Sequence, residues 1–238
     1  NITHDPRLRP RTAFVSQAGK PDVQGMETSL HRQLKERYCT AGSLIEQRVG
    51  RYRIDVVQPK QLVEIQLASL TAIRDKIAKL VEDHRVLLVK PIIAQKHLVK
   101  LHKSGGQVVS RRRSPKQGKL LDLFEEFVHF TRVYPHRRLT VEVPMLVIEE
   151  WRYPGHGRRR WKHANDHLKE DQLLIEVLEV HQFRTAADLC RLLPKKLPKP
   201  FHTGHLAEGL GVQRWIAQQM AYCLREMGAI QKVGKQRG

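Results

Sequence analysis

The sequence has few cysteines for its length. Among 238 residues there are 3, Cys39, Cys190 and Cys223, and no two of them form a C-x-x-C pair. An odd number without such a pair argues against a disulfide framework and against a thiolate zinc site. We therefore expect a chain that works in a reducing compartment.

Long apolar runs are also absent. No stretch approaches the roughly 20 apolar residues of a membrane-spanning helix, and no basic amphipathic helix has the aromatic face of a membrane-surface helix. Residues 1–25 are polar, contain prolines and lack the apolar core of a signal peptide, so we expect a mobile basic arm there. These absences favour a cytoplasmic chain without a membrane partner.

Acidic residues are outnumbered. The chain has 43 Lys and Arg against 24 Asp and Glu, a formal net charge of +19. Such an excess repels itself in a compact fold, but it suits a polyanion whose condensed counterions are released on binding. DNA is therefore the expected partner, while a homodimer and a further partner protein stay open.

Apolar spacing predicts two domains with separate apolar cores. Residues 26–150 are expected to form a mixed α/β domain, residues 151–164 a basic linker, and residues 165–238 a mostly α-helical DNA-binding domain. The alternative for residues 151–163 is a strand pair that continues the first domain.

The first domain alternates helical and strand-like patterns. The expected elements are a helix at 26–38, strands at 43–49, 52–58 and 61–67, a helix at 70–84, a strand at 86–94, a helix at 120–134 and a strand at 139–148. The order α, β, β, β, α, β predicts a mixed sheet flanked by helices. Residues 96–119 carry eight Lys or Arg and no acid, which fits either a solvated loop or a phosphate-contacting arm.

The second and third strands are expected to oppose two carboxylates. A hairpin that pairs Gln58 with Gln61 brings Asp55 opposite Glu64. Alternation then puts two sets of residues on opposite faces: Arg53, Asp55, Glu64 and Gln66 on one, and Ile54, Val56, Val63, Ile65 and Leu67 on the other. Opposed like charges destabilise a sheet unless they are neutralised, by a hard divalent cation or by a basic neighbour such as Arg53 or Lys60.

This pattern resembles the PD-(D/E)XK nuclease superfamily. The match covers roughly residues 26–95, from a first helix with Glu27 through Asp55 to E-x-Q at residues 64–66 and the helix and strand that follow. The resemblance implies a nuclease-like fold in which Asp55 and Glu64 bind Mg²⁺ or Mn²⁺ and Glu27 completes the site. It also implies hydrolysis of DNA phosphodiester bonds as the reaction.

Two positions depart from that superfamily. Ile54 stands where the family has Pro, and Gln66 stands where Lys is usual. Because Gln carries no charge, Arg53 or Lys76 would have to supply the missing cation. The alternative function is a non-catalytic DNA-binding or regulatory protein that keeps the nuclease-like fold, and Gln66 is the residue that separates the two interpretations.

The C-terminal part resembles a winged helix. Helices are expected at 168–180, 184–193, 205–210 and 213–227, with Thr185 as a cap, a turn at Gly211 and a short strand within 228–238. The resemblance implies base or phosphate contacts by Gln213, Arg214, Gln218, Lys232, Lys235 and Arg237. Further DNA contacts are expected from Arg111, Arg112, Arg113, Arg158, Arg159 and Arg160. Winged helices also serve as protein-interaction modules, and that alternative stays open.

Overall fold

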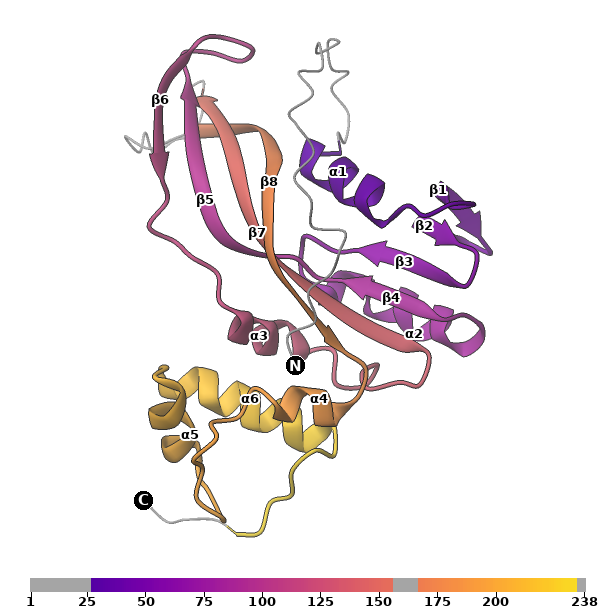
Figure 1. Cartoon of the computed structure of the whole chain (residues 1–238), viewed down its shortest axis with the longest axis vertical. Coiled ribbons are helices and arrows are strands. Elements are labelled where there is room, and N and C mark those ends of the chain that lie inside the picture. The colour runs from indigo at the N-terminus through magenta and orange to yellow at the C-terminus, as the bar shows by residue number, and fades with distance from the viewer. Residues whose placement is uncertain (1–26, 156–166, 235–238) are drawn as a thin grey trace.

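The computed structural model describes residues 27–155 and 167–234, and at their centre lies an eight-stranded mixed sheet (Figure 1). The strand order is β1-β2-β3-β4-β7-β5-β6, and β8 pairs with β7. The strands are β1 (Leu44–Val49), β2 (Tyr52–Gln58), β3 (Gln61–Ile65), β4 (Val86–Val89), β5 (Ile92–Leu101), β6 (Val108–Arg113), β7 (Leu139–Pro154) and β8 (His167–Phe183). The expected mixed α/β class, with a sheet flanked by helices, is confirmed.

The helices of the described residues fall into two groups. Those beside the sheet are α1 (Ser29–Tyr38), the 3-10 turn η1 (Leu70–Ile73), α2 (Arg74–Asp83), the 3-10 turn η2 (Leu120–Asp122) and α3 (Leu123–Phe127). Those after β8 are α4 (Ala186–Cys190), α5 (Thr203–Leu210) and α6 (Arg214–Glu226). None of these helices is long and apolar enough to cross a membrane.

The first six principal elements have the expected order, α1, β1, β2, β3, α2, β4. Thr28 caps α1, and Leu30 and Leu34 of that helix are buried against the sheet. Strands β1, β2 and β3 are antiparallel, whereas β3 and β4 are parallel. The expected hairpin register is confirmed, since Gln58 lies opposite Gln61.

Strand β2 does not keep the expected alternation. Ile54 is buried on the α2 side of the sheet with Leu62, whereas Val56 is buried on the α1 side with Val63 and Ile65. The prediction that Ile54 shares a face with Val56 is therefore wrong. The cause is Asp55, whose carboxylate accepts the hydrogen bond of the Ile65 N–H and so interrupts the regular pairing beyond Val56.

The apolar run at 86–94 belongs to two strands and not to one. Strand β4 ends at Val89, and β5 begins at Ile92 after Lys90 and Pro91. Proline has no N–H to give to a sheet, which is consistent with a break there. Both strands pair in parallel with β7, so the run stays buried while it passes from one side of β7 to the other.

The helix expected at 120–134 is shorter in the structure. Only η2 and α3 are helical, and the chain then turns so that Phe130 and Tyr134 are buried. The ring of Phe127 stacks on that of Tyr134 with centroids 5.1 Å apart. Ring packing in the core therefore takes the place of the last helical turns.

The helix expected at 168–180 is wrong, because these residues form β8. Strand β8 pairs with β7 from Phe183 opposite Val141 to His167 opposite Pro154. The spacing of the leucines favours a helix, but pairing with β7 makes this segment a strand, because strand formation depends strongly on tertiary context. The alternative interpretation of residues 151–163, a strand pair that continues the first domain, agrees with the described ends of β7 and β8. Residues 167–183, which were expected in the second domain, belong to the sheet.

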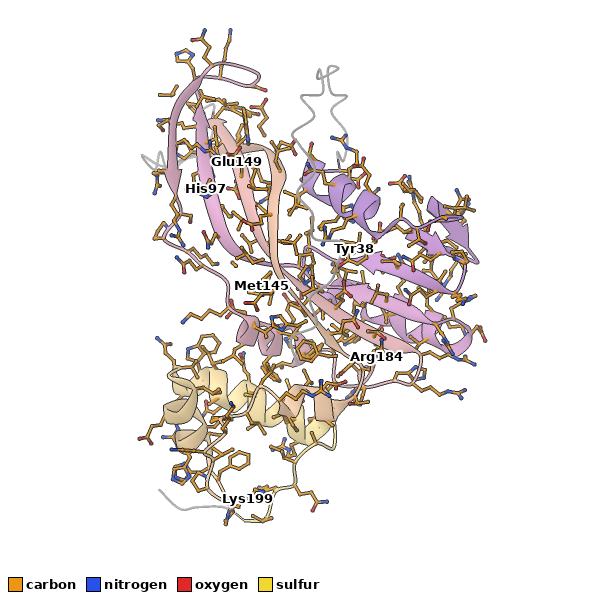
Figure 2. The ribbon with its side chains drawn as sticks, viewed as in Figure 1. Tyr38, His97, Met145, Glu149, Arg184 and Lys199 are labelled. Carbon is orange, nitrogen blue, oxygen red and sulfur yellow. The ribbon has the colours of Figure 1, made fainter. Side chains whose placement is uncertain are left out.

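Strand β6 and the outer parts of β5, β7 and β8 extend away from the rest of the sheet as an arm (Figure 1). Every residue of β6 is exposed. Figure 2 labels His97 of β5 and Glu149 of β7 on this arm, where they are paired in the sheet register. The basic segment 96–119 is thus largely a β-hairpin.

The C-terminal helices share the core of the sheet. Met220, Cys223 and Leu224 of α6 are buried in the same apolar cluster as Phe124 of α3, and the Cys223 thiol lies 3.5 Å from the Phe124 carbonyl oxygen. The expectation of two separate apolar cores is therefore wrong. Burial also raises the pKa of the Cys223 thiol to about 12.

Local signals in this region are confirmed. Thr185 and Asp188 form a capping box at the start of α4. Gly211 has φ +62°, the left-handed conformation that glycine adopts without strain, between α5 and α6. Residues 228–234 form no strand, so the expected wing strand is not found in the described part of that segment.

Candidate functional site

Asp55 and Glu64 lie beside each other where β2 separates from β3. The Asp55 carboxylate accepts a hydrogen bond of 2.7 Å from the Ile65 N–H. The Asp55 side chain is thus held by the backbone of β3. The side chains are 17% and 8% exposed, so both carboxylates are largely removed from water.

The Glu64 carboxyl has an unusual environment. Burial raises its pKa and the neighbouring Asp55 charge raises it further, against the lowering effect of Lys76 and the Asp55 N–H. The Lys76 ammonium group contacts one carboxylate oxygen and also donates to the Arg53 carbonyl at 2.6 Å. The other oxygen, Oε2, is buried and has no hydrogen-bond partner. An orphaned buried oxygen is costly unless a proton or a cation joins it.

Helix α1 contacts Asp55 from the face of the sheet opposite α2. The Nδ1 atom of His31 lies 2.8 Å from a Glu27 oxygen, and its Nε2 atom lies 3.5 Å from an Asp55 oxygen and 3.2 Å from the Ile65 carbonyl. Contact with Asp55 raises the pKa of His31 more than burial lowers it. Glu27 is therefore linked to Asp55 through the imidazole ring.

Glu46 joins this network from β1. It has φ +56°, a left-handed conformation that is uncommon for a residue other than glycine and costs on the order of 1–3 kcal/mol. Its carboxylate contacts the ammonium group of Lys35, which is buried, and the guanidinium group of Arg53. These contacts with Lys35 and Arg53 hold the pKa of Glu46 below its ordinary value.

The polar residues expected on one face of the β2–β3 hairpin do not form a single face in the structure. Asp55 meets His31 of α1, whereas Glu64 meets Lys76 of α2, and the two helices cover opposite faces of the sheet. The Gln66 amide donates to the Ser69 carbonyl at 2.9 Å and so turns into the loop after β3. Asp55 and Glu64 are brought together as expected, but not as members of one flat face with Gln66 and Arg53.

A metal ion has partial support from this geometry. Within residues 27–155 and 167–234, no group of three or more His, Cys, Asp or Glu side chains is placed to hold a metal. Magnesium, however, is commonly bound by one or two carboxylates together with waters and substrate phosphates. The Asp55 and Glu64 pair, with the unpartnered Glu64 oxygen, fits that mode and does not fit a complete protein cage.

Three residues of the network were missed by the sequence interpretation. His31 and Lys35 lie four residues apart on one stripe of α1, and this spacing was a usable signal. Glu27, expected on the first helix, instead precedes the Thr28 cap, because the helix begins at Ser29, and it meets both side chains from there. Glu46 had no comparable signal, because its position depends on a backbone conformation. Lys76, expected as one of two sources of positive charge, does contact Glu64.

The expected DNA-contacting residues are at the surface wherever they are described. Arg111, Arg112 and Arg113 are exposed on β6, and Arg111 contacts Glu149. Gln213, Arg214, Gln218 and Lys232 are exposed in or beside α6. Arg158, Arg159, Arg160, Lys235 and Arg237, like the expected N-terminal arm, lie outside the described residues.

The fold and this site define a mixed α/β protein with a charged cluster where β2 leaves β3 and with a helical C-terminal part. The family model described as "Domain of unknown function (DUF8091)" matches residues 28–184, and the chain belongs to that family. The match stops at Arg184, which Figure 2 labels near the point where β8 gives way to α4. It therefore includes the whole sheet and leaves α4, α5 and α6 outside.

One relative is similar to this chain over most of its length. An uncharacterized protein of Treponema pallidum (strain Nichols) is 30% identical over 189 residues, which are 78% of this chain and 74% of that protein. No solved structure matches the chain.

Proposed function

We propose that the chain is a metal-dependent nuclease that hydrolyses DNA phosphodiester bonds at Asp55 and Glu64. The observation that carries the proposal is the Glu64 carboxylate, which is buried beside a second carboxylate and retains an oxygen without a partner. A carboxyl whose pKa is raised by burial and by a like charge is typical of active sites. Structural ion pairs also perturb pKa values, and a cleavage assay separates the two.

Each residue of the site has a role that its contacts support. Asp55 and Glu64 would hold Mg²⁺ or Mn²⁺, which would activate a water and offset the charge of the scissile phosphate. Burial and the Asp55 charge raise the pKa of Glu64, and a bound cation would offset both effects. Lys76 brings the positive charge that Gln66 lacks and would stabilise negative charge on the phosphate oxygens.

The order of the elements also supports the proposal. The sequence α1, β1, β2, β3, α2, β4 and the neighbouring positions of the four strands agree with the arrangement on which the resemblance to the PD-(D/E)XK superfamily rests. The departure at Gln66 is offset by Lys76, which reaches Glu64 from α2. The departure at Ile54 leaves the two carboxylates unaffected, because Ile54 is buried in the core on the α2 side.

DNA as the substrate is supported by charge. The chain carries +19, and the β5–β6 hairpin with its flanks has eight basic residues and no acidic one. Arg112 and Arg113 are exposed on the edge strand β6. Such groups bind phosphates without regard to sequence and release counterions when they do.

Incubation of the full chain with plasmid, linear duplex and branched DNA tests the proposal. Cleavage is expected with Mg²⁺ or Mn²⁺, none with EDTA, and none for Asp55→Asn or Glu64→Gln. Lys76→Ala should lower the rate by about 100-fold or more, as loss of an oxyanion-stabilising group does. Lys79→Ala is the matched control, since Lys79 is exposed on the same helix and pairs with Glu82. Cleavage that survives both carboxylate substitutions would contradict the proposal.

A second function has one observation in its favour. Lys76 already contacts Glu64, and the two carboxylates are approached from opposite faces of the sheet, which suits an ion-pair network as well as a metal site. A non-catalytic DNA-binding protein would bind DNA in EDTA, cleave none of the three substrates, and gain no stability from the metal.

A further inference from the structure

Helix α6 exposes two large aromatic side chains on one stripe. Trp215 is 46% exposed and Tyr222 is 38% exposed. They are seven residues apart, about two helical turns or 10 Å along the axis, and so lie on the same side of the helix. Gln218 lies between them and is exposed as well. We call Trp215, Gln218 and Tyr222 the α6 stripe.

The other side of α6 accounts for the packing of the helix. Ala217, Met220, Cys223 and Leu224 are buried in the core shared with the sheet, so the α6 stripe is not needed to hold the helix in place. Trp and Tyr are enriched among the residues that contribute most to binding a partner. The Trp215 N–H donates to the Gln213 side-chain oxygen at 2.5 Å.

The surroundings of the α6 stripe are basic. Arg214 is exposed at the start of α6. The Arg225 guanidinium group lies 5.5 Å from the centre of the Tyr222 ring and is paired with Glu226 at 2.8 Å. Residues 186–234 contain seven Lys or Arg and three Asp or Glu. Aromatic rings within an excess of positive charge are the combination that binds single-stranded nucleic acid, through stacking and phosphate contacts.

We propose that the α6 stripe binds unpaired bases of DNA, with Trp215 and Tyr222 stacking on base faces and Arg214 and Arg225 contacting phosphates. In a duplex the bases stack on one another and offer only their edges to a helix in the groove. Unpaired bases offer their faces. The inference rests on the proposed function because both take DNA as the substrate, and it narrows that substrate to DNA with single-stranded or unpaired segments.

Fluorescence anisotropy with the full chain in EDTA tests this proposal. The probes are a labelled single strand, the same sequence as a duplex, and a strand of the same length made of abasic sites. Trp215→Ala with Tyr222→Ala should weaken binding to the single strand by about 10-fold or more, because one stacked base contributes roughly 1–3 kcal/mol. Duplex binding should change by less than about two-fold, since it depends mainly on phosphate contacts.

Two controls keep the outcome clear. The variant Trp215→Phe with Tyr222→Phe retains the rings and should restore most of the single-strand affinity. The abasic strand has no bases to stack. It should therefore bind the unsubstituted chain about as weakly as the intact strand binds the double Ala variant. Equal losses on duplex and single strand, or no loss on either, overturn the proposal, as does a Phe variant as weak as the Ala variant. Because no metal is present, these results stand apart from cleavage. If binding depends on the α6 stripe but no DNA is cleaved, the nuclease proposal alone is rejected. If DNA is cleaved but single-strand binding does not depend on the α6 stripe, the proposal for the stripe alone is rejected.

Discussion

The carboxylate of Asp55 and the backbone N–H of Ile65 are joined by a hydrogen bond of 2.7 Å between β2 and β3. This side-chain bond replaces a backbone bond of the sheet at the point where the strands separate. Asp55 therefore has a structural task in addition to any role with a metal, and the two tasks call for different substitutions.

Asp55→Ala should lower the free energy of unfolding by about 1–3 kcal/mol, because the Ile65 N–H loses its acceptor in a largely buried place. Asp55→Asn keeps an acceptor oxygen and should cost clearly less while still abolishing metal-dependent cleavage. Urea unfolding in EDTA, followed by circular dichroism, measures both. Asp75→Asn, at an 88% exposed position on α2, is the control. Equal losses for the Ala and Asn variants would show that the Ile65 bond does not stabilise the fold.

The raised pKa of Glu64 predicts how stability depends on pH. In the folded protein, burial first and Asp55 second disfavour the ionised carboxylate, so the unfolded chain ionises at lower pH than the folded one. Below its ordinary pKa, near about pH 4, Glu64 is protonated in both the folded and the unfolded chain and does not lower the free energy of unfolding. Stability is then lost as the pH rises through the ordinary pKa toward the raised one.

Glu64→Gln cannot ionise and should escape that loss. In EDTA the variant should be more stable than the unsubstituted chain near neutral pH, and the two should converge at about pH 4. Urea midpoints across this range measure the difference. Glu82→Gln, which changes an exposed acid paired with Lys79, should show no such convergence. A Glu64→Gln variant that is less stable at neutral pH would mean that the Lys76 ion pair outweighs the burial of the charge.

Much of the first half of the fold could be predicted from the sequence, because the signals there are local. The stripe of Leu30 and Leu34 indicates α1, and the short turn at Pro59 and Lys60 sets the hairpin register, which pairs Gln58 with Gln61 and ends beside Asp55 and Glu64. A capping residue such as Thr185 acts within its own helix turn, so it too is visible without a structure.

The remainder depends on contacts between distant residues. Strand β8 has leucines at helical spacing and is a strand only because β7 pairs along its length. The break of alternation at Asp55 follows from a bond to Ile65, and Glu46 has a left-handed conformation that its residue type does not favour. No pattern within one segment could have predicted these three features.

Added Mg²⁺ or Mn²⁺ should raise the melting temperature of the unsubstituted chain. An ion that binds only the folded form stabilises it by about 2.7 kcal/mol at 100 times its dissociation constant. Asp55→Asn and Glu64→Gln should each remove most of this gain, as measured by differential scanning calorimetry with and without EDTA. A gain of the same size in Glu64→Gln would place the ion elsewhere.

DNA binding should be separable from the carboxylate site. Replacing Arg111, Arg112 and Arg113 with Ala should weaken duplex binding and should reduce the slope of log affinity against log salt by about 0.9 for each phosphate that the variant no longer neutralises. Asp55→Asn should bind in EDTA as the unsubstituted chain does. The matched control replaces three exposed basic residues of the sheet body, Arg37, Lys79 and Arg85. Equal losses in both triple variants would mean that net charge alone, and not the β6 arm, determines affinity.

The shared core predicts that the C-terminal helices and the sheet unfold together, although the family match ends at Arg184. Leu224 of α6 is fully buried in the cluster that contains Phe124, so Leu224→Ala should cost about 2–5 kcal/mol of unfolding free energy. Because the cluster is continuous, a single calorimetric transition should shift to lower temperature as one peak. Gln218→Ala, at an exposed position of the same helix, should leave it nearly unchanged. Two resolved transitions, of which Leu224→Ala moves only one, would show that the helices fold independently of the sheet despite their packing against α3.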